Sequence, residues 1–183
     1  NNKFNGHVNL RNLPLKLMGT SLIVTTESNF SYDTENGPQI QLSNLEIEEA
    51  GNSISSNPKV VMSGNATRYG AAIDSIAYTD LYSVLQGSAD VMLNVNNKVF
   101  DSLGIMLNLR NPFTEEGITI DGSISNPDHV SFTKENIVKN IYMNLQMQMK
   151  NFSLNRFVVQ KNDNNLVTGM VYASGTLEHP YLS

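Results

Sequence analysis

The segment from Ile141 to Lys150 constrains the fold more than any other part of the chain. Its odd-numbered positions are all apolar: Ile141, Met143, Leu145, Met147 and Met149. Because side chains on a strand alternate between two faces, this spacing predicts a strand with one apolar and one wet face. A helix would scatter the same five side chains around its axis. At ~3.3 Å per residue the apolar stripe is roughly 30 Å long, so something must cover it.

The same alternation recurs along the chain and predicts an all-β protein. The pattern indicates about a dozen short strands, antiparallel or solenoid-like, and no amphipathic helix longer than two turns. Strand character is expected at residues 59–67, 87–95, 105–109, 118–124 and 141–150, with turns at 33–38 and 126–128. Asn111-Pro112 is expected to end the strand before it.

Several segments carry more specific expectations. Pro14 favours an extended connection or a short helix over a central strand. The β-branched run at 22–26 predicts a strand covered on more than one side, and the strands of 40–47 are expected to break around Ser43-Asn44. A short helical turn is expected at Thr79 to Leu85. Strand character continues through Val130 and Phe132, a bulge is expected at Asn155-Arg156, a turn at 162–165, and the last strand at Leu166 to Leu177.

Length and composition limit the functions that the chain can have. A chain of 183 residues predicts one domain, and its formal net charge of −5 argues against nucleic acid as a partner. The absence of Cys excludes disulfides, a thiol nucleophile and Cys-based metal sites. No apolar run approaches the ~18 residues of a membrane span. Without targeting features, residues 1–183 are expected to be a single all-β segment of a longer protein.

The sequence offers no catalytic or metal-binding constellation. His7, His129 and His179 are scattered, with none of the paired spacings that metal sites use. Glu46 and Glu48 are expected to share the wet face of a strand. The segment beginning at Asp33 faintly resembles a calcium loop but lacks the later ligands. We therefore expect neither enzyme activity nor a metal or other cofactor.

One phrase recurs inside the predicted strands: a polar residue, Gly, a small polar residue and an apolar one. It occurs around Gly64, Gly87, Gly122 and Gly175, and the last two copies reach a Pro at the same offset, Pro127 and Pro180. Gly within a strand marks a bulge, a bend or the close approach of another backbone. Chance repetition of common residues is the alternative explanation.

These phrases resemble a known family. Val171-Tyr-Ala-Ser-Gly-Thr-Leu-Glu-His-Pro-Tyr-Leu-Ser183 is similar to the Gly-x-apolar-x-x-Pro-x-apolar strand signature of TamB and its AsmA-like relatives. Asn5-Gly-His-Val-Asn-Leu-Arg-Asn-Leu-Pro-Leu15 and Val84-Leu-Gln-Gly-Ser-Ala-Asp-Val-Met-Leu93 also resemble phrases of that family. The resemblance extends over most of the chain, through short motifs.

The resemblance implies a fold, a ligand and a location. TamB-like proteins form a long, U-bent β-sheet with an apolar inner groove and span the periplasm from the inner to the outer membrane. They are associated with phospholipid transfer and outer-membrane protein assembly. A phospholipid or other acyl-chain ligand is therefore expected, as is an outer-membrane barrel partner bound through regions outside this segment, with an anchor in the inner membrane.

The expected lipid-binding groove consists of inward-facing apolar residues of four predicted strands. They are Val91, Leu93, Ile105, Leu107, Leu109, Ile118, Ile120, Ile141, Met143, Leu145, Met147 and Met149. Methionine favours an adaptable surface because its thioether chain packs against many shapes. Two alternatives remain open: a structural or adhesive cell-surface module with a dry core, and a scaffold that pairs nascent outer-membrane proteins with an exposed edge strand.

Overall fold

The computed structural model describes residues 3–17, 20–50, 58–80, 83–96, 99–130, 133–153 and 165–183. The elements are β1 (Phe4–Leu17), β2 (Thr20–Asp33), β3 (Gly37–Glu49), β4 (Lys59–Thr67), β5 (Gly70–Thr79), β6 (Val84–Asn96), β7 (Val99–Arg110), β8 (Gly117–Ser125), α1 (Lys134–Asn140), β9 (Tyr142–Ser153), β10 (Leu166–Thr176) and β11 (Pro180–Leu182).

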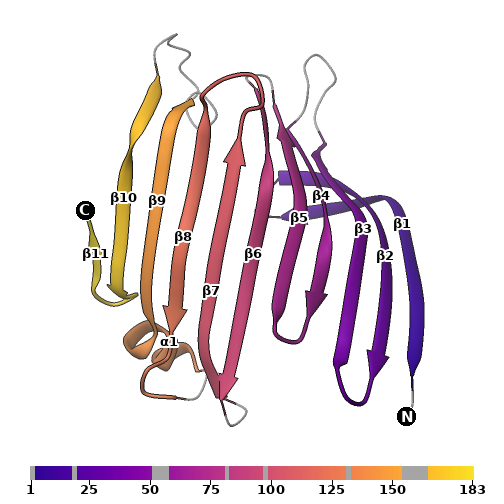
Figure 1. The fold of residues 1–183 in the computed structure, drawn as a ribbon, viewed down its shortest axis with the longest axis horizontal. Coiled ribbons are helices and arrows are strands. Elements are labelled where there is room, and N and C mark those ends of the chain that lie inside the picture. Colours follow the sequence, from indigo (N-terminus) through magenta and orange to yellow (C-terminus); the bar gives the residue numbers. More distant parts are fainter. Residues whose placement is uncertain are drawn as a thin grey trace.

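The eleven strands form one antiparallel sheet in which each strand pairs with its neighbours in sequence (Figure 1). The sheet is not closed: β1 is one edge, and β10 with the short β11 is the other. The prediction of an all-β, curved sheet with an apolar inner groove is confirmed. Its solenoid-like alternative is wrong, because consecutive strands pair antiparallel with each other and give a meander.

Most strands are longer than expected, because irregular positions bend them without ending them. β1 to β10 contain 9 to 14 residues each. The predicted break at Ser43-Asn44 is wrong, since β3 continues through it with a shift in register between Leu42 and Leu45 opposite β4. Pro14 lies within β1, which is an edge strand, where the missing N–H of proline is tolerated.

The expected coverage of residues 22–26 on more than one side is also wrong. This run lies in β2, between β1 and β3, and its five side chains are half-buried. Val24 faces the same side of the sheet as its partner Leu13, whereas Ile23 faces the opposite side. A run of β-branched residues here reflects an interior strand of a single layer, which explains why neither side is fully buried.

Two expectations at the connections were wrong. Thr79 ends β5 and Val84 begins β6, so a helical turn does not span Thr79 to Leu85, and residues 81–82 of the expected turn lie outside the described residues. The Asp80 N–H donates to the Ser83 carbonyl at 3.1 Å, and the Ser83 N–H donates to the Asp80 carboxylate at 2.9 Å. Val130 does not continue a strand, because Asn126 holds its backbone in a turn, and α1 follows. Phe132 lies outside the described residues.

The end of the chain turns back on itself. β10 ends at Thr176, and Leu177 lies in the turn that leads into β11, where Pro180 pairs with Gly175. Pro180 therefore opens a short edge strand, a position that proline tolerates. The bulge expected at Asn155-Arg156 falls outside the described residues, as do residues 162–164 of the expected turn. The predicted turns at 33–38 and 126–128 are confirmed.

A line of register shifts crosses half of the sheet. Shifts occur in β1 after Leu10, in β2 before Ser28, in β3 after Leu42, in β4 after Ser63 and in β5 after Ile73. Bulges bend a strand and increase its twist. Figure 1 shows β1 and β2 bending back behind the rest of the sheet, whereas the β7–β8 and β8–β9 ladders run without a shift.

The four glycine phrases mark close approaches between strands, as one of their sequence interpretations predicts. A Cβ atom at Gly64, Gly87 or Gly122 would overlap the carbonyl of Ala72, Asn108 or Asn144 respectively. At Gly175 a Cβ would lie 2.5 Å from the His179 carbonyl oxygen. No larger residue fits these positions without moving the backbone of the neighbouring strand or, at Gly175, of the turn before β11.

The few buried side chains lie near strand ends. Among the described residues, the apolar side chains classed as buried are Leu85 (2% exposed), Phe152 (5%) and Ile141 (6%). Leu85 is the second residue of β6, Phe152 the penultimate residue of β9, and Ile141 directly precedes β9. The middle of the sheet contributes no fully buried apolar residue, which is the reverse of a β-sandwich core.

Candidate functional site: an open apolar face

Cross-strand pairing places eleven of the twelve predicted groove residues on one face of the sheet. Residues directly opposite each other in adjacent strands share a face. In β6 to β10 the paired rows are Leu93–Leu103–Ile124–Met143–Gly175, Val91–Ile105–Gly122–Leu145–Ala173, Ala89–Leu107–Ile120–Met147–Val171 and Gly87–Leu109–Ile118–Met149–Gly169. We call this side of the sheet the apolar face. Ile141 is the exception, because it lies before β9 and is buried.

The apolar face continues across β1 to β5, which the sequence prediction of the groove omitted. One unbroken row of directly paired residues runs from β1 to β10: Leu10, Thr26, Leu45, Met62, Ile76, Gly87, Leu109, Ile118, Met149 and Gly169. A second row contains Leu13, Val24, Ile47, Val60, Tyr78 and Leu85. The bulges hide this continuity in the sequence because each one interrupts the two-residue period.

This face is long enough for extended hydrocarbon chains. The unbroken row crosses ten strands, and nine intervals at ~4.8 Å give a length of about 43 Å. An acyl chain occupies one leaflet, about half of the ~30 Å hydrocarbon thickness of a bilayer. The face therefore has room for more than one acyl chain laid across the strands.

Exposure identifies the apolar face as the inner one. In β6, Ala89, Val91 and Leu93 are half-buried, whereas their chain neighbours Asp90 and Met92 are exposed. In β9, Met143, Met147 and Met149 are half-buried, and Asn144 and Gln148 are exposed. In a flat single layer both faces would be equally open, so the difference indicates that the sheet curves around its apolar side.

The opposite side, the polar face, carries amides, hydroxyls and a few ion pairs. Glu46 and Glu48 share it, as predicted, and Glu46 lies 2.7 Å from the Lys59 ammonium. The polar face is not uniformly polar, since Met92 and Met106 are exposed on it. The polar face therefore has the mixed composition of an ordinary solvated protein surface.

Hollows in the surface lie over the polar face and at the strand ends. A hollow of about 500 Å³ over β1 to β4 is lined by polar-face side chains such as Asn29, Gln41 and Asn65. Another, of about 340 Å³, contains Arg110, Glu115 and Lys150, and the last two form an ion pair at 3.1 Å. The apolar face is an open trough, because no described element packs over it.

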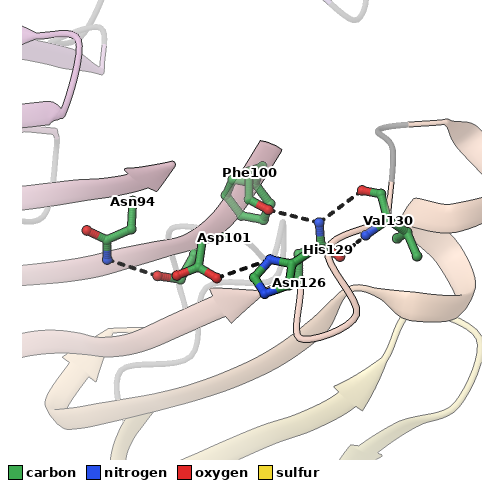
Figure 2. Close-up of polar contacts among 7 residues, drawn as sticks. Asn94, Phe100, Asp101, Asn126, His129 and Val130 are labelled. Atoms are coloured by element: carbon green, nitrogen blue, oxygen red, sulfur yellow. Dashed lines mark hydrogen bonds and ion pairs between the residues drawn. The ribbon is translucent and has the colours of Figure 1, made fainter. Parts of the chain in front are cut away.

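A buried polar network fixes the lower rim of the trough in Figure 1. Asn126 is fully buried, and its side-chain amide donates to the carbonyls of Phe100 at 2.9 Å and Val130 at 3.0 Å (Figure 2). Its side-chain oxygen accepts the Val130 N–H at 3.1 Å. His129 follows with φ of 50° and lies 3.5 Å from Asp101. This network anchors the connection between β8 and α1.

The opposite rim is fixed by a second buried polar group. Glu116 is 8% exposed and accepts the Ser153 N–H at 3.3 Å, which links the β7–β8 turn to the end of β9. The side-chain oxygen of Asn111 accepts the N–H groups of Phe113 and Thr114 at 2.8 and 3.2 Å. Both rims are therefore held by hydrogen bonds, and the apolar floor lies between them.

Several polar residues outside the apolar face make local hydrogen bonds. The Nδ1 atom of His7 lies 3.0 Å from the Asn29 side-chain oxygen. Asp33 accepts the N–H groups of Glu35 at 2.9 Å and Asn36 at 2.6 Å, which closes a turn and holds the pKa of Asp33 below its ordinary value, mainly through the Asn36 N–H. In the part of the chain that the structure describes, no three His, Asp or Glu side chains group as metal ligands would.

Comparison with protein-family models, curated proteins and solved structures gave no match in any of the three. None of the helical residues described here forms a helix long and apolar enough to cross a membrane.

Proposed function

We propose that this chain is a lipid-binding trough segment of a TamB-like, periplasm-spanning protein. Its ligand is a phospholipid or another molecule with acyl chains, which lie against the apolar face across the strands. The acyl chains move between inner and outer membranes along the sheet, and the same segment supports outer-membrane protein assembly. The resemblance supports the envelope location, the inner-membrane anchor and the outer-membrane barrel partner.

The observation that carries the lipid proposal is an apolar face without a second layer. Most apolar side chains of β6 to β9 face one way, yet no described element stacks over them, and α1 has seven residues at one rim. Contiguous apolar surface of this extent marks a binding site for protein, ligand or membrane. The net charge of −5 argues against a nucleic acid as the binding partner.

The arrangement favours the trough over the dry-core module that the sequence left open. A dry core needs two apolar layers about 10 Å apart. Here Leu93, Leu107, Leu145 and Met147 lie in a single layer and are half-buried, and the buried apolar residues lie near strand ends. Met143, Met147 and Met149 of β9 have flexible side chains that pack against many shapes, so they suit a ligand with disordered acyl chains.

Photocrosslinking tests the proposal directly. A photoreactive amino acid replaces Met147 on the apolar face or Gln148 on the polar face, in the same strand. The chain is produced in a diderm bacterium, irradiated in the cells and examined by mass spectrometry for phospholipid adducts. We expect adducts at position 147 and none at 148. Crosslinks from 147 only to other residues of this chain would overturn the proposal in favour of a dry core.

A further inference from the structure

The hollow of about 500 Å³ on the polar face has an uncharged lining: none of the described residues that form it is acidic or basic. Its walls are two parallel rows of directly paired residues that carry amide and hydroxyl groups. The rows are Asn5–Ser31–Gln39–Thr67 and Asn29–Gln41–Asn65. Its floor is the backbone of the positions between the rows, which belong to the apolar face: Gly6, Phe30, Ile40 and Ala66. We call this site the amide hollow.

The amide groups of the hollow are available to a ligand. Asn29, Gln39, Gln41 and Asn65 are all exposed. The Asn29 side-chain oxygen is 3.0 Å from Nδ1 of His7, whereas the Asn65 amide donates to a carboxylate outside the hollow at 3.3 Å. Within the described part of the chain, the side-chain amides of Gln39 and Gln41 form no hydrogen bond. The two outer amides are thus oriented by neighbours, and the central ones remain free.

Charged groups near the amide hollow are engaged elsewhere. Further along the polar face of β3 and β4, Glu46 and Lys59 form an ion pair at 2.7 Å. At the near end of the strands, Asp33 accepts two N–H groups of the β2–β3 turn, and Arg68 donates to a carbonyl of that turn at 3.3 Å. Figure 1 shows this turn and the β4–β5 turn at the bottom of the sheet. The uncharged surface is therefore a local property of this end of the strands.

An exposed aromatic ring lies next to the amide hollow. Thr67, at the end of one row, accepts the Tyr69 N–H at 3.1 Å, and Tyr69 is 58% exposed. The Arg68 guanidinium lies 4.6 Å from the centre of the Tyr69 ring, a cation–π contact that restrains it. Tyrosine combines an apolar ring with a hydroxyl group, which suits the C–H face and the hydroxyls of a sugar.

The chemistry of the lining favours a neutral ligand with many hydroxyl groups. A phosphate or carboxylate ligand needs Lys or Arg in its site. An added peptide strand needs unpaired backbone, whereas β2 and β3 are paired on both sides. A side-chain amide both donates and accepts hydrogen bonds. Sugar hydroxyls and acetamido groups have the same double capacity, so rows of amides match a saccharide.

We propose that the amide hollow binds an uncharged saccharide chain with hydroxyl and acetamido groups, which lies across β1 to β4. Gln39 and Gln41 exchange hydrogen bonds with these groups from the two walls. Four strands at ~4.8 Å span about 14 Å, and the volume of about 500 Å³ is within the range of ~300–1,000 Å³ for small-molecule sites.

This site is independent of the lipid proposal, because the amide hollow lies on the opposite face of the sheet. It is also independent of where the sheet ends. A further strand beyond β1 would add in the plane of the sheet and leave the polar face of β1 to β4 open.

Titration of the 183-residue chain with a matched pair of saccharides tests the proposal. An oligomer of N-acetylglucosamine is the neutral probe, and its deacetylated, cationic form is the control. Nitrogen-15 NMR follows the side-chain amide signals. We expect the neutral oligomer to shift the Gln39 and Gln41 signals saturably, with a Kd on the order of 1 mM for such an open site. The cationic form should shift them less, although the net charge of −5 attracts cations.

Two variants separate the amide hollow from the rest of the polar face. Gln41→Ala removes a central amide and should raise the Kd of the neutral oligomer roughly 3- to 10-fold, as expected for a lost hydrogen bond. Asn144→Ala is the matched control, because Asn144 is an exposed amide on the polar face of β9, outside the hollow. It should leave the Kd unchanged. Circular dichroism should show the natural fold for both variants, since both side chains are exposed.

Three results would overturn the proposal. One is the absence of saturable shifts at Gln39 and Gln41 with the neutral oligomer. Another is equal or tighter binding of the deacetylated form, which would assign the hollow to a cationic ligand. The third is a Kd that Gln41→Ala leaves unchanged, or that Asn144→Ala raises equally, which places the oligomer elsewhere. None of these results affects the lipid proposal, whose test is photocrosslinking at Met147.

Discussion

Gly122 of β8 lies directly opposite Leu145 of β9, at the centre of the apolar face. The Asn144 carbonyl occupies the position that a Cβ of Gly122 would take, and the φ of Gly122 is 153°. The apolar stripe of β9 therefore lies beside a position of β8 that has to be glycine. At this pair, the close packing of β9 against β8 requires the backbone conformation of Gly122.

We therefore predict that Gly122→Ala destabilises the sheet. Alanine at a positive φ, with a backbone carbonyl in the place of its Cβ, should lower the free energy of unfolding by roughly 1–3 kcal/mol. Urea unfolding followed by circular dichroism measures the change. Gly169→Ala in β10 is the matched control: a Cβ there meets nothing within 4 Å. It should be neutral, or stabilising by up to about 1 kcal/mol. Equal losses for both variants would contradict the close approach at Gly122.

Met147→Asp separates an open trough from a dry core. In a trough the new carboxylate stays in contact with water, so the free energy of unfolding should fall by less than about 1 kcal/mol, as at an ordinary surface position. Acyl-chain binding should be lost, because a charge next to hydrocarbon is costly. Circular dichroism and the lipid content of the purified chain report the two effects. Gln148→Asp on the polar face should retain both fold and lipid. Loss of folding in Met147→Asp alone would indicate a buried core.

The Asp33 turn should make the β2–β3 hairpin sensitive to acid. Because the Asn36 N–H lowers the pKa of Asp33 from 3.8, its carboxylate stabilises the folded state above the unfolded pKa. This contribution is lost as the pH falls through the lowered folded-state pKa. The difference in melting temperature between the natural chain and Asp33→Asn should therefore shrink between pH 7 and about pH 2. A difference that stays constant with pH would show that the charge has no role.

Much of this fold could be predicted because the two faces of a single-layer sheet appear in the sequence as a regular alternation of apolar and polar residues. Met143, Leu145 and Met147 alternate with polar residues that face the solvent, and no described element stacks over either side to blur the pattern. The glycine phrases were informative for the same reason, since Gly87 and Gly122 meet a neighbouring backbone. The part of the apolar face in β6 to β9 therefore followed from periodicity alone.

The parts that could not be predicted depend on contacts between distant residues. The bulges after Leu42 and Ile73 shift the period by one position, so the sequence pattern breaks where the strand continues. Ile141 has the spacing of the groove but lies outside β9, because the stretch that contains α1 leads into the strand there. The turn at Val130 is set by Asn126, whose role is invisible without its partners in other elements.

Asn126 should be among the residues most important for stability. It is fully buried, and its side chain satisfies two carbonyls and one N–H of the β8–α1 connection (Figure 2). Asn126→Ala leaves those groups without partners, and each buried unsatisfied group costs about 1–3 kcal/mol. We expect the free energy of unfolding to fall by at least about 2 kcal/mol. Asn94→Ala removes one exposed bond to Ser102, of 2.9 Å, and should change stability by less than about 0.5 kcal/mol. Similar values for both variants in urea unfolding would mean that water replaces the Asn126 side chain and that this rim is open.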